Sequence, residues 1–234
     1  RNEHLKKTAD VFYHLAWESA SGEGRSDPFI QFRNVELTLH MLTEAYECGC
    51  KKFVSLGTCY EKLTLPEKFG NSDFYVVSKR YAHESADRLA KKLGIEFVWT
   101  TVCHPIGKGI KPNQMIAYVI NTLKNNETPK MGPAKTWYDI VSVNDLALGL
   151  RLIGENNLTQ REYFIGSGKP RILRDYLLEI PQILDTKTTV DIGARPDDGL
   201  RFDKEWFDIS PLENETGYIP KVSYEDAILN ITLQ

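Results

Sequence analysis

Residues 73–81, DFYVVSKRY, place a tyrosine four positions before a lysine. If this segment is helical, Tyr75 and Lys79 lie on one face of the helix, about one turn apart. An ammonium near a phenol favours the phenolate and lowers the tyrosine pKa from about 10. A tyrosine tuned in this way can exchange a proton with a substrate hydroxyl during catalysis. The spacing alone fits a half-buried tyrosine beside a solvated lysine equally well, so the surrounding elements must decide.

The composition is that of an ordinary globular protein. The chain has 234 residues, enough for one large domain or two small ones. Acidic and basic residues are mixed and the formal net charge is −3, which argues against a nucleic-acid binder with a basic face. No apolar run approaches the length of a membrane span, and no signal peptide is visible. The four cysteines, at positions 48, 50, 59 and 103, have neither disulfide nor zinc spacing, so we expect reduced thiols, a cytoplasmic location and no metal site.

Apolar strands alternate with amphipathic helices in the first half of the chain. We predict strands at 10–17, 51–56 and 95–103. We predict helices at about 28–48, where Asp27 and Pro28 form a capped start, and from Asp73 to Leu93. This alternation indicates an α/β fold with a parallel sheet covered on both faces.

The second half is less regular. Its predicted elements are a helix at 114–125, a strand at 137–143, a helix from Asn144 or Asp145 to about Gly154, a strand and turn at 161–168, a helix at 173–184 with a break at Pro181, and a strand at 188–193. Ser210 and Ser223 are predicted helix caps, the latter forming a capping box with Asp226.

Three predicted strand ends carry polar or unusual residues. In a parallel sheet, ligands bind beyond the carboxyl ends of the strands. The ends here are HLAW at 14–17, SLGTCYE at 55–61 and TVCHPIG at 101–107. Since the helix that carries Tyr75 begins one loop after the second end, Thr58 is expected at the same crevice. Its hydroxyl could hydrogen-bond the oxygen that Tyr75 protonates.

Six segments, in order, resemble the extended short-chain dehydrogenase/reductase superfamily, the group of NAD-dependent sugar-nucleotide epimerases and dehydratases. They are FYHLAW, NVELTLHMLTEAYECGCKKFVSLGT, YVVSK, YDIVSVNDLALGL, GARPDDGL and TGYIPKVSYEDAI. The resemblance implies a Rossmann-type doubly wound parallel sheet, with its N-terminal strands missing from this chain, and a smaller mixed α/β substrate domain. It implies that residues 1–110 are the remaining part of the NAD(P)-binding domain. Residues 111–234 would mainly bind substrate, with 137–154 returning to the Rossmann sheet.

The resemblance also assigns roles. Tyr75 would be the general acid/base, Lys79 would bind the nicotinamide ribose and lower the tyrosine pKa, and Thr58 would take the family's Ser/Thr position. A second register, which matches Tyr60 to the family's Val-Tyr-Gly, points to Leu56 or Ser55 instead. The implied ligand contacts are Leu15, Ala16, Trp17, Leu56, Gly57 and Cys103, with Tyr75 and Lys79, for NAD or NADP, and Thr58, His104 and Arg195 for a nucleotide-sugar substrate. The simpler alternatives are core packing for Leu15, Ala16 and Trp17, a structural role for His104 and an exposed loop position for Arg195.

Departures from the family pattern narrow the expected reaction. No G-x-G-x-x-G fingerprint is present, so we expect that Arg1 is not the biological start. Cys59 and Tyr60 follow Thr58 where dehydratases carry acids, which favours a C4 epimerase or 4-keto reductase over a 4,6-dehydratase. His104 replaces a usual asparagine, and Tyr138 a usual arginine. A non-catalytic dinucleotide-binding protein of the same fold is a further alternative. The resemblance implies a homodimer through the helices at about 28–48 and 74–92.

Overall fold

A parallel sheet of four strands forms the centre of one part of the molecule. The computed structural model describes residues 9–63 and 73–232. The strands stand in the order β1-β2-β3-β8, and each neighbouring pair is parallel. They are β1 (Val11–His14), β2 (Lys52–Leu56), β3 (Glu96–Thr101) and β8 (Glu162–Phe164).

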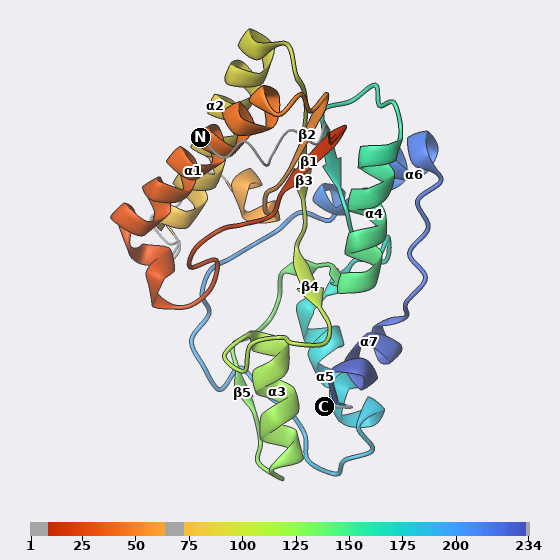
Figure 1. The fold of residues 1–234 in the computed structure, drawn as a ribbon. Helices are drawn as coiled ribbons and strands as arrows, with labels where there is room; N and C mark the ends of the chain where they lie inside the picture. Colours follow the sequence, from red (N-terminus) through yellow and green to blue (C-terminus); the bar gives the residue numbers. More distant parts are fainter. Residues whose placement is uncertain (1–8, 64–72, 233–234) are drawn as a thin grey trace.

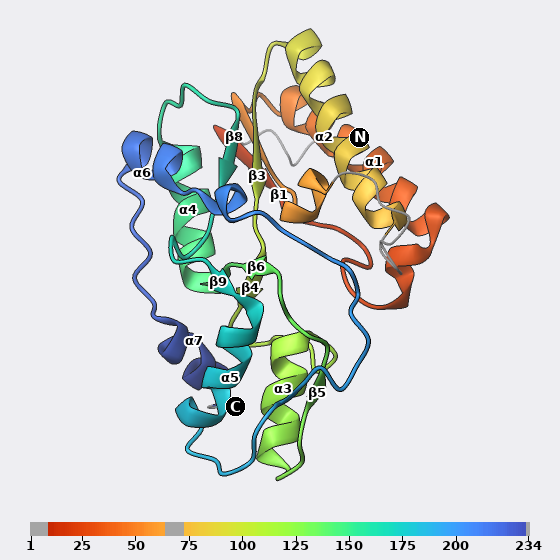
Figure 2. The same ribbon diagram turned by 180° about the vertical axis from the view of Figure 1, so that it is seen from behind.

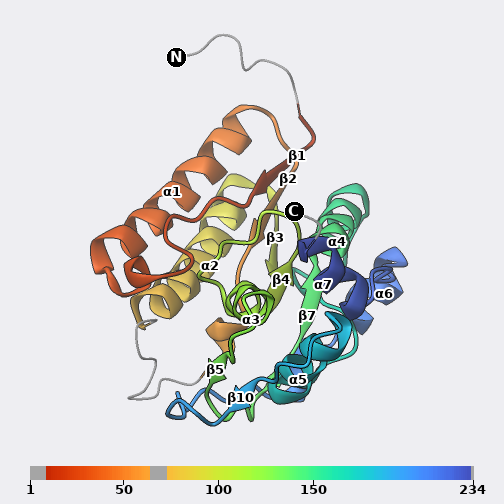
Figure 3. The ribbon, with the colours of Figure 1, turned by 90° about the horizontal axis from the view of Figure 1, so that it is seen from below.

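Helices cover both faces of this sheet. Because successive strand residues point to opposite faces, Phe53 packs in one apolar cluster with residues of α1 and α2, whereas Val54 packs in another with residues of α4 and α6. These helices are α1 (Pro28–Glu47), α2 (Asp73–Leu93), α4 (Val143–Glu155) and α6 (Ser210–Thr216). Figures 1 and 3 show α1 and α2 to one side of β1–β3 and α4 to the other. The doubly wound α/β fold is therefore confirmed.

Local sequence explains the α1/α2 pair. Asp27 caps α1, since one carboxylate oxygen accepts from the amides of Phe29 at 2.8 Å and Ile30 at 3.1 Å. On α2, the small residues Ala82, Ala86 and Ala90 recur every four positions and are fully buried, which lets the helix lie close to its neighbours.

A second group of elements lies below the sheet in Figures 1 and 2. It contains α3 (Met115–Lys124), α5 (Leu173–Ile183) and α7 (Tyr224–Thr232), which share an apolar cluster. Three two-stranded sheets join it: β4 (His104–Ile106) with β7 (Ile140–Ser142), β6 (Trp137–Tyr138) with β9 (Arg171–Ile172), and β5 (Lys130–Met131) with β10 (Asp191–Ile192).

Asp145 joins α4 to a distant part of the chain. Its buried carboxylate accepts hydrogen bonds from the Ser142 hydroxyl at 2.9 Å and from the backbone amides of Lys221 at 2.9 Å and Val222 at 3.0 Å. The segment that leads into α7 is thereby attached to the first turn of α4.

Several predicted boundaries were wrong. The first strand ends at His14 rather than at residue 17, so Leu15–Trp17 leave the sheet. Pro181 does not break its helix at that residue, since α5 continues to Ile183. The predicted strand at 137–143 is split at Asp139 into β6 and β7. The strands predicted at 161–168 and 188–193 are shorter in the structure, namely β8 and β10.

Of the helix caps predicted in the second half of the chain, one is confirmed and the others were wrong. Ser142, not Asn144 or Asp145, caps α4: its hydroxyl accepts from the Asp145 amide at 3.0 Å. Ser210 is the first residue of α6 rather than its cap. Ser223 does precede α7, and its hydroxyl accepts from the Asp226 amide at 3.0 Å, as predicted.

Among the residues that the structure describes, none of the helices combines the length and the apolar character that a membrane span needs.

Candidate active site

One cleft lies where β1, β2 and β3 end. It has a volume of about 450 Å³. Its wall is lined by Leu15, Trp17, Ala20, Ser21, Gly22, Arg25, Leu56, Gly57, Thr58, Tyr60, Tyr75, Lys79, Val102, Cys103, His104, Pro105, Asn113, Gln114, Met115 and Tyr138. The carboxyl ends of the parallel strands thus meet at one site, as the sequence predicted.

Thr58 is held in place by a carboxylate. It begins a short 3-10 helix, η3 (Cys59–Lys62), and its backbone amide donates to Glu61 Oε1 at 2.7 Å. The other oxygen of Glu61 accepts from the Trp99 indole at 3.0 Å. The Glu61 side chain is only 7% exposed, so both bonds lie away from water. They fix the turn that carries Thr58.

Gly57 makes this arrangement possible. A Cβ atom at this position would lie 2.3 Å from the Trp99 indole nitrogen and 2.5 Å from Glu61 Oε1. Glycine therefore leaves room for the Glu61–Trp99 contact behind the cleft, in addition to lining the cleft itself.

Tyr75 is buried and lines the cleft together with Thr58. Burial raises the pKa of Tyr75 to about 12, while the charge of Arg25 and a side-chain hydrogen bond with Thr58 act in the opposite direction. The guanidinium carbon of Arg25 lies 4.2 Å from the centre of the Tyr75 ring. At neutral pH the phenol is protonated and can donate a proton.

Lys79 lines the cleft and contacts Leu56 and Trp17. Its ammonium donates to the Leu56 carbonyl at 2.7 Å and lies 3.7 Å from the centre of the Trp17 indole. Burial lowers the pKa of Lys79 to about 7, and the Glu61 carboxylate opposes this shift. The cation over the Tyr75 ring in this structure is Arg25, whereas Lys79 was expected to be the cation that tunes the phenol.

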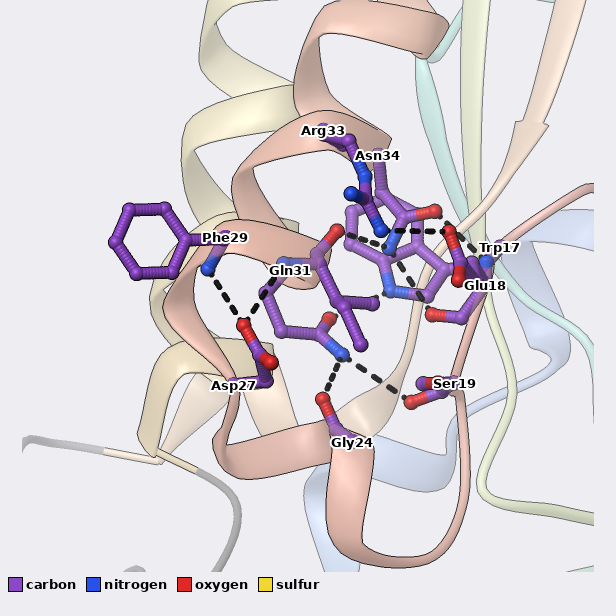
Figure 4. A network of polar contacts seen from close by, with 10 residues as sticks. Trp17, Glu18, Ser19, Gly24, Asp27, Phe29, Gln31, Arg33 and Asn34 are labelled. Carbon is purple, nitrogen blue, oxygen red and sulfur yellow. Dashed lines mark hydrogen bonds and ion pairs between the residues drawn. The ribbon is translucent and has the colours of Figure 1, made fainter.

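The loop after β1 is attached to α1 by a polar network, drawn in Figure 4. The Trp17 indole donates to Gln31 Oε1 at 2.9 Å, and the Gln31 amide donates to the carbonyls of Ser19 at 3.2 Å and Gly24 at 2.8 Å. Gln31 is fully buried. The network sets the positions of Trp17 and of the short helix η2 (Glu23–Ser26), which carries Arg25.

His104 and Tyr138 also line the cleft. The Tyr138 hydroxyl lies 3.3 Å from His104 Nδ1, and the buried Nε2 of His104 has no hydrogen-bond partner among the residues that the structure describes. Burial lowers the pKa of His104 to about 4, so the ring is neutral at pH 7. Burial, together with the neighbouring Cys59 thiol, raises the pKa of Cys103.

The cleft brings together most of the residues singled out from the sequence. Leu15, Trp17, Leu56, Gly57, Thr58, Tyr75, Lys79, Cys103 and His104 all line it. Ala16 is exposed and does not line it. Arg195 also lies outside: its guanidinium donates to the Tyr118 hydroxyl at 3.2 Å. Of the two registers weighed for Thr58, only the first places a hydroxyl in the cleft, since Ser55 is buried and donates to the His14 carbonyl at 3.5 Å.

Sequence reasoning missed Arg25 and the role of Glu61. Arg25 lies in the aperiodic polar segment ESASGEGRSD, where no pattern indicates which side chain points inward. Its one usable signal was its place in the loop that follows a strand end. Among the described residues, no group of three or more His, Cys, Asp or Glu side chains could hold a metal ion.

Residues 2–166 match the model of the family described as "NAD dependent epimerase/dehydratase family". No curated protein matches the chain in sequence. Solved structures resemble it closely in fold at low sequence identity. RMD from Pseudomonas aeruginosa, complexed with NADPH, is 17% identical over 96% of this chain and 80% of its own, with a TM-score of 0.80.

Two further structures resemble the chain to a similar degree. The UDP-glucuronic acid 4-epimerase from Bacillus cereus, in complex with NAD, is 19% identical over 98% of this chain and 76% of its own, with a TM-score of 0.77. DesIV, a dTDP-glucose 4,6-dehydratase from Streptomyces venezuelae, is 21% identical over 96% of this chain and 73% of its own, with a TM-score of 0.73. At these identities the likeness concerns the fold.

Proposed function

The chain belongs to the NAD dependent epimerase/dehydratase family, and we propose that it transfers hydride between a nicotinamide cofactor and C4 of a nucleotide sugar, as an epimerase or a 4-keto reductase. The observation that carries the proposal is that Tyr75, Thr58 and Lys79 line one cleft beyond the end of β2. A buried phenol beside a hydroxyl is suited to proton exchange with a sugar oxygen.

The residues of the cleft fit a dinucleotide. Arg25 and Lys79 line the cleft, and no carboxylate is found among the described residues of its wall, so an anionic ligand is favoured. Leu15, Trp17 and Leu56 supply an apolar surface for a flat ring, and Lys79 supplies donors for a ribose. When bound, a nicotinamide would accept or deliver the hydride. NAD and NADPH are found with relatives of the same fold, which supports this assignment.

The acid/base steps follow from the state of Tyr75. Because burial keeps the phenol protonated at neutral pH, it can give its proton to the oxygen of a 4-keto sugar as the alcohol forms. In the reverse direction the phenolate takes the proton from the C4 hydroxyl. Thr58 would share the charge on that oxygen, and the unpartnered Nε2 of His104 would bind another sugar hydroxyl.

The orientation of Glu61, three residues after Thr58, favours an epimerase or a reductase over a dehydratase. Elimination of water from the sugar needs an acid and a base near its ring. Glu61 is turned away from the cleft, with one oxygen on the Thr58 amide and the other on the Trp99 indole. Cys59 and Tyr60, which precede it, carry no acid.

We further propose that the chain has a cofactor-binding part and a substrate-binding part, that it forms a homodimer, and that it is cytoplasmic. Residues up to about 110 would hold the cofactor, and the remainder mainly the substrate, except 137–154. A homodimer would form through α1 and α2, where Phe29, Phe32, Tyr46, Phe74, Val77 and Tyr81 are exposed. A cytoplasmic location fits the four free thiols.

Cofactor binding is the direct test. Titration with NADH and NADPH should quench the tryptophan fluorescence saturably, because Trp17 lines the cleft. The Trp17→Phe variant should lose most of the quenching, whereas Trp206→Phe, which replaces a tryptophan outside the cleft, should keep it. Nucleotide sugars would then be assayed for turnover. If neither cofactor binds, a non-catalytic protein of the same fold is the better description.

A further inference from the structure

Arg25 is a cation in the cleft that has no anionic partner among the described residues. Within the described ranges no ion pair joins it to a carboxylate, and its buried Nε has no hydrogen-bond partner. No Asp or Glu lies on the described wall of the cleft either. A partly buried guanidinium without an anionic partner is unfavourable by itself, and an anion in the cleft that accepts from its terminal nitrogens would reduce the penalty.

The guanidinium is held in a fixed place. Its central carbon lies 4.2 Å from the centre of the Tyr75 ring and 4.9 Å from that of Tyr60. The short helix that carries it is attached to α1 by the Gln31 amide, which donates to the Gly24 carbonyl at 2.8 Å (Figure 4). Stacking on two rings and anchoring of the backbone prepare the side chain for a ligand and reduce the entropy lost on binding.

We propose that Arg25 binds a carboxylate on the sugar ring, so that the preferred substrate is the nucleotide derivative of a uronic acid. The inference rests on the proposed function, because it takes Tyr75 as the group that serves the oxygen on C4. The planar guanidinium matches a carboxylate in two parallel hydrogen bonds.

The position of Arg25 distinguishes the sugar carboxylate from other anions. A phosphate of the nucleotide or of the cofactor would satisfy the same donors. In a hexopyranose, however, C6 is attached to C5, next to C4, whereas the nucleotide diphosphate is attached to C1 across the ring. Arg25 stacks on the ring of Tyr75 itself. A carboxylate borne on C5 is therefore near enough to C4 to reach Arg25 while C4 faces the Tyr75 hydroxyl, whereas the diphosphate on C1 is further away.

Paired ligands that differ only in the carboxylate test this. Dissociation constants of the full chain with NAD present would be measured by calorimetry for UDP-glucuronate and UDP-glucose, and for GDP-mannuronate and GDP-mannose. We expect the wild type to prefer the acid of one pair by about 10²-fold. Arg25→Gln should remove that preference by weakening the acid alone, and Arg25→Lys should restore part of it. Arg88→Gln, at an exposed arginine on α2, should change nothing.

Each of the alternative results would overturn the inference and would indicate a different role for Arg25. Equal weakening of acid and neutral sugar in Arg25→Gln would assign Arg25 to the nucleotide phosphates. A raised dissociation constant for NADH in the same variant would assign it to the cofactor. Unchanged dissociation constants for all of these ligands in Arg25→Gln would show that Arg25 binds none of them. Binding of the neutral sugars with turnover, but without a preference for the acid, would overturn this inference and retain the proposed function. Failure to bind any nucleotide sugar would overturn both. Circular dichroism of each variant would establish that it is folded.

Discussion

The ammonium of Lys79 lies 3.7 Å from the centre of the Trp17 indole, a contact between α2 and the loop after β1. The π face of the indole and the Leu56 carbonyl both favour the charged lysine, whereas burial lowers its pKa to about 7. Lys79 therefore titrates close to neutral pH while it faces the cleft.

Replacing Lys79 should change how stability depends on pH. The folded-state pKa is about 7, below the ordinary value of 10.5, so between these values the unfolded chain binds more protons than the folded one. The contribution of Lys79 to the free energy of unfolding therefore rises from pH 7 towards pH 10. The Lys79→Met variant should gain stability relative to the wild type below pH 7, and this gain should shrink as the pH rises. Urea unfolding from pH 6 to 9.5 measures the difference. A gain that does not vary with pH would contradict the lowered pKa.

Tyr75→Phe should reduce turnover by about 10²- to 10⁴-fold, since it removes the proton donor and keeps the ring. The fold and the binding of NADH should be unaffected, because the ring can still pack on Trp17. Tyr81→Phe on the same helix is the matched control, since Tyr81 is exposed and outside the cleft. Full activity in the Tyr75 variant would refute its role in proton transfer.

Glu61→Gln should destabilise the protein by about 1–3 kcal/mol. Glutamine has one acceptor oxygen, so its amide group must face either the Thr58 amide or the Trp99 indole, both of which are donors. The turn that carries Thr58 would shift, and turnover should fall along with stability. Urea unfolding and steady-state kinetics measure the two effects, with Glu84→Gln, at an exposed position on α2, as the control. Equal stability of both variants would show that the carboxylate is not needed to hold the turn.

Asp139→Asn tests a second buried group. Burial raises the pKa of Asp139 to about 6, although the Ser167 amide and hydroxyl each donate to it at 2.8 Å. Between about pH 4 and 6 the folded state binds more protons, so the contribution of Asp139 to stability falls as the pH rises. Asparagine can keep both contacts without the charge. The stability of the variant relative to the wild type should therefore increase from pH 4 to pH 7, by on the order of 2 kcal/mol. A decrease over this range would mean that the charged form is preferred.

A charge on the exposed face of α1 should disrupt the proposed dimer. Phe29 is 79% exposed, and Phe29→Asp should convert a species of two chains to one in sedimentation equilibrium. Ile219→Lys, at a residue that is 61% exposed and outside these helices, should leave the assembly unchanged. A wild type that sediments as a single chain would refute the proposed interface.

Features that follow from regular sequence patterns, namely the helix starts and the parallel sheet, could be predicted from the sequence. Asp27 before Pro28 marked the start of α1, and apolar strands between amphipathic helices indicated the parallel sheet, whose geometry then brings Thr58 and Tyr75 together. Side-chain direction could not be predicted in the same way. Lys79 has several rotatable bonds, and only the packed structure shows that its ammonium reaches Trp17.

Arg25 and Arg195 show the same limit in loops. Neither lies in a periodic segment, so their tertiary neighbours alone decide that Arg25 enters the cleft and that Arg195 contacts Tyr118. Pro181 was predicted to break its helix because a proline lacks a backbone donor, yet α5 continues for two residues beyond it.

The carboxylate of Asp145 has a consequence for biosynthesis. Its partners, the amides of Lys221 and Val222, lie 76 and 77 positions further along the chain. On a ribosome that adds roughly 5–20 residues per second, the sheet with α1 and α2 can pack several seconds before these amides emerge. During that interval the carboxylate has the nearby Ser142 hydroxyl as a partner, and water must take the place of the two amides. The nascent chain is therefore expected to expose this corner of α4 to chaperones until the segment before α7 has been made.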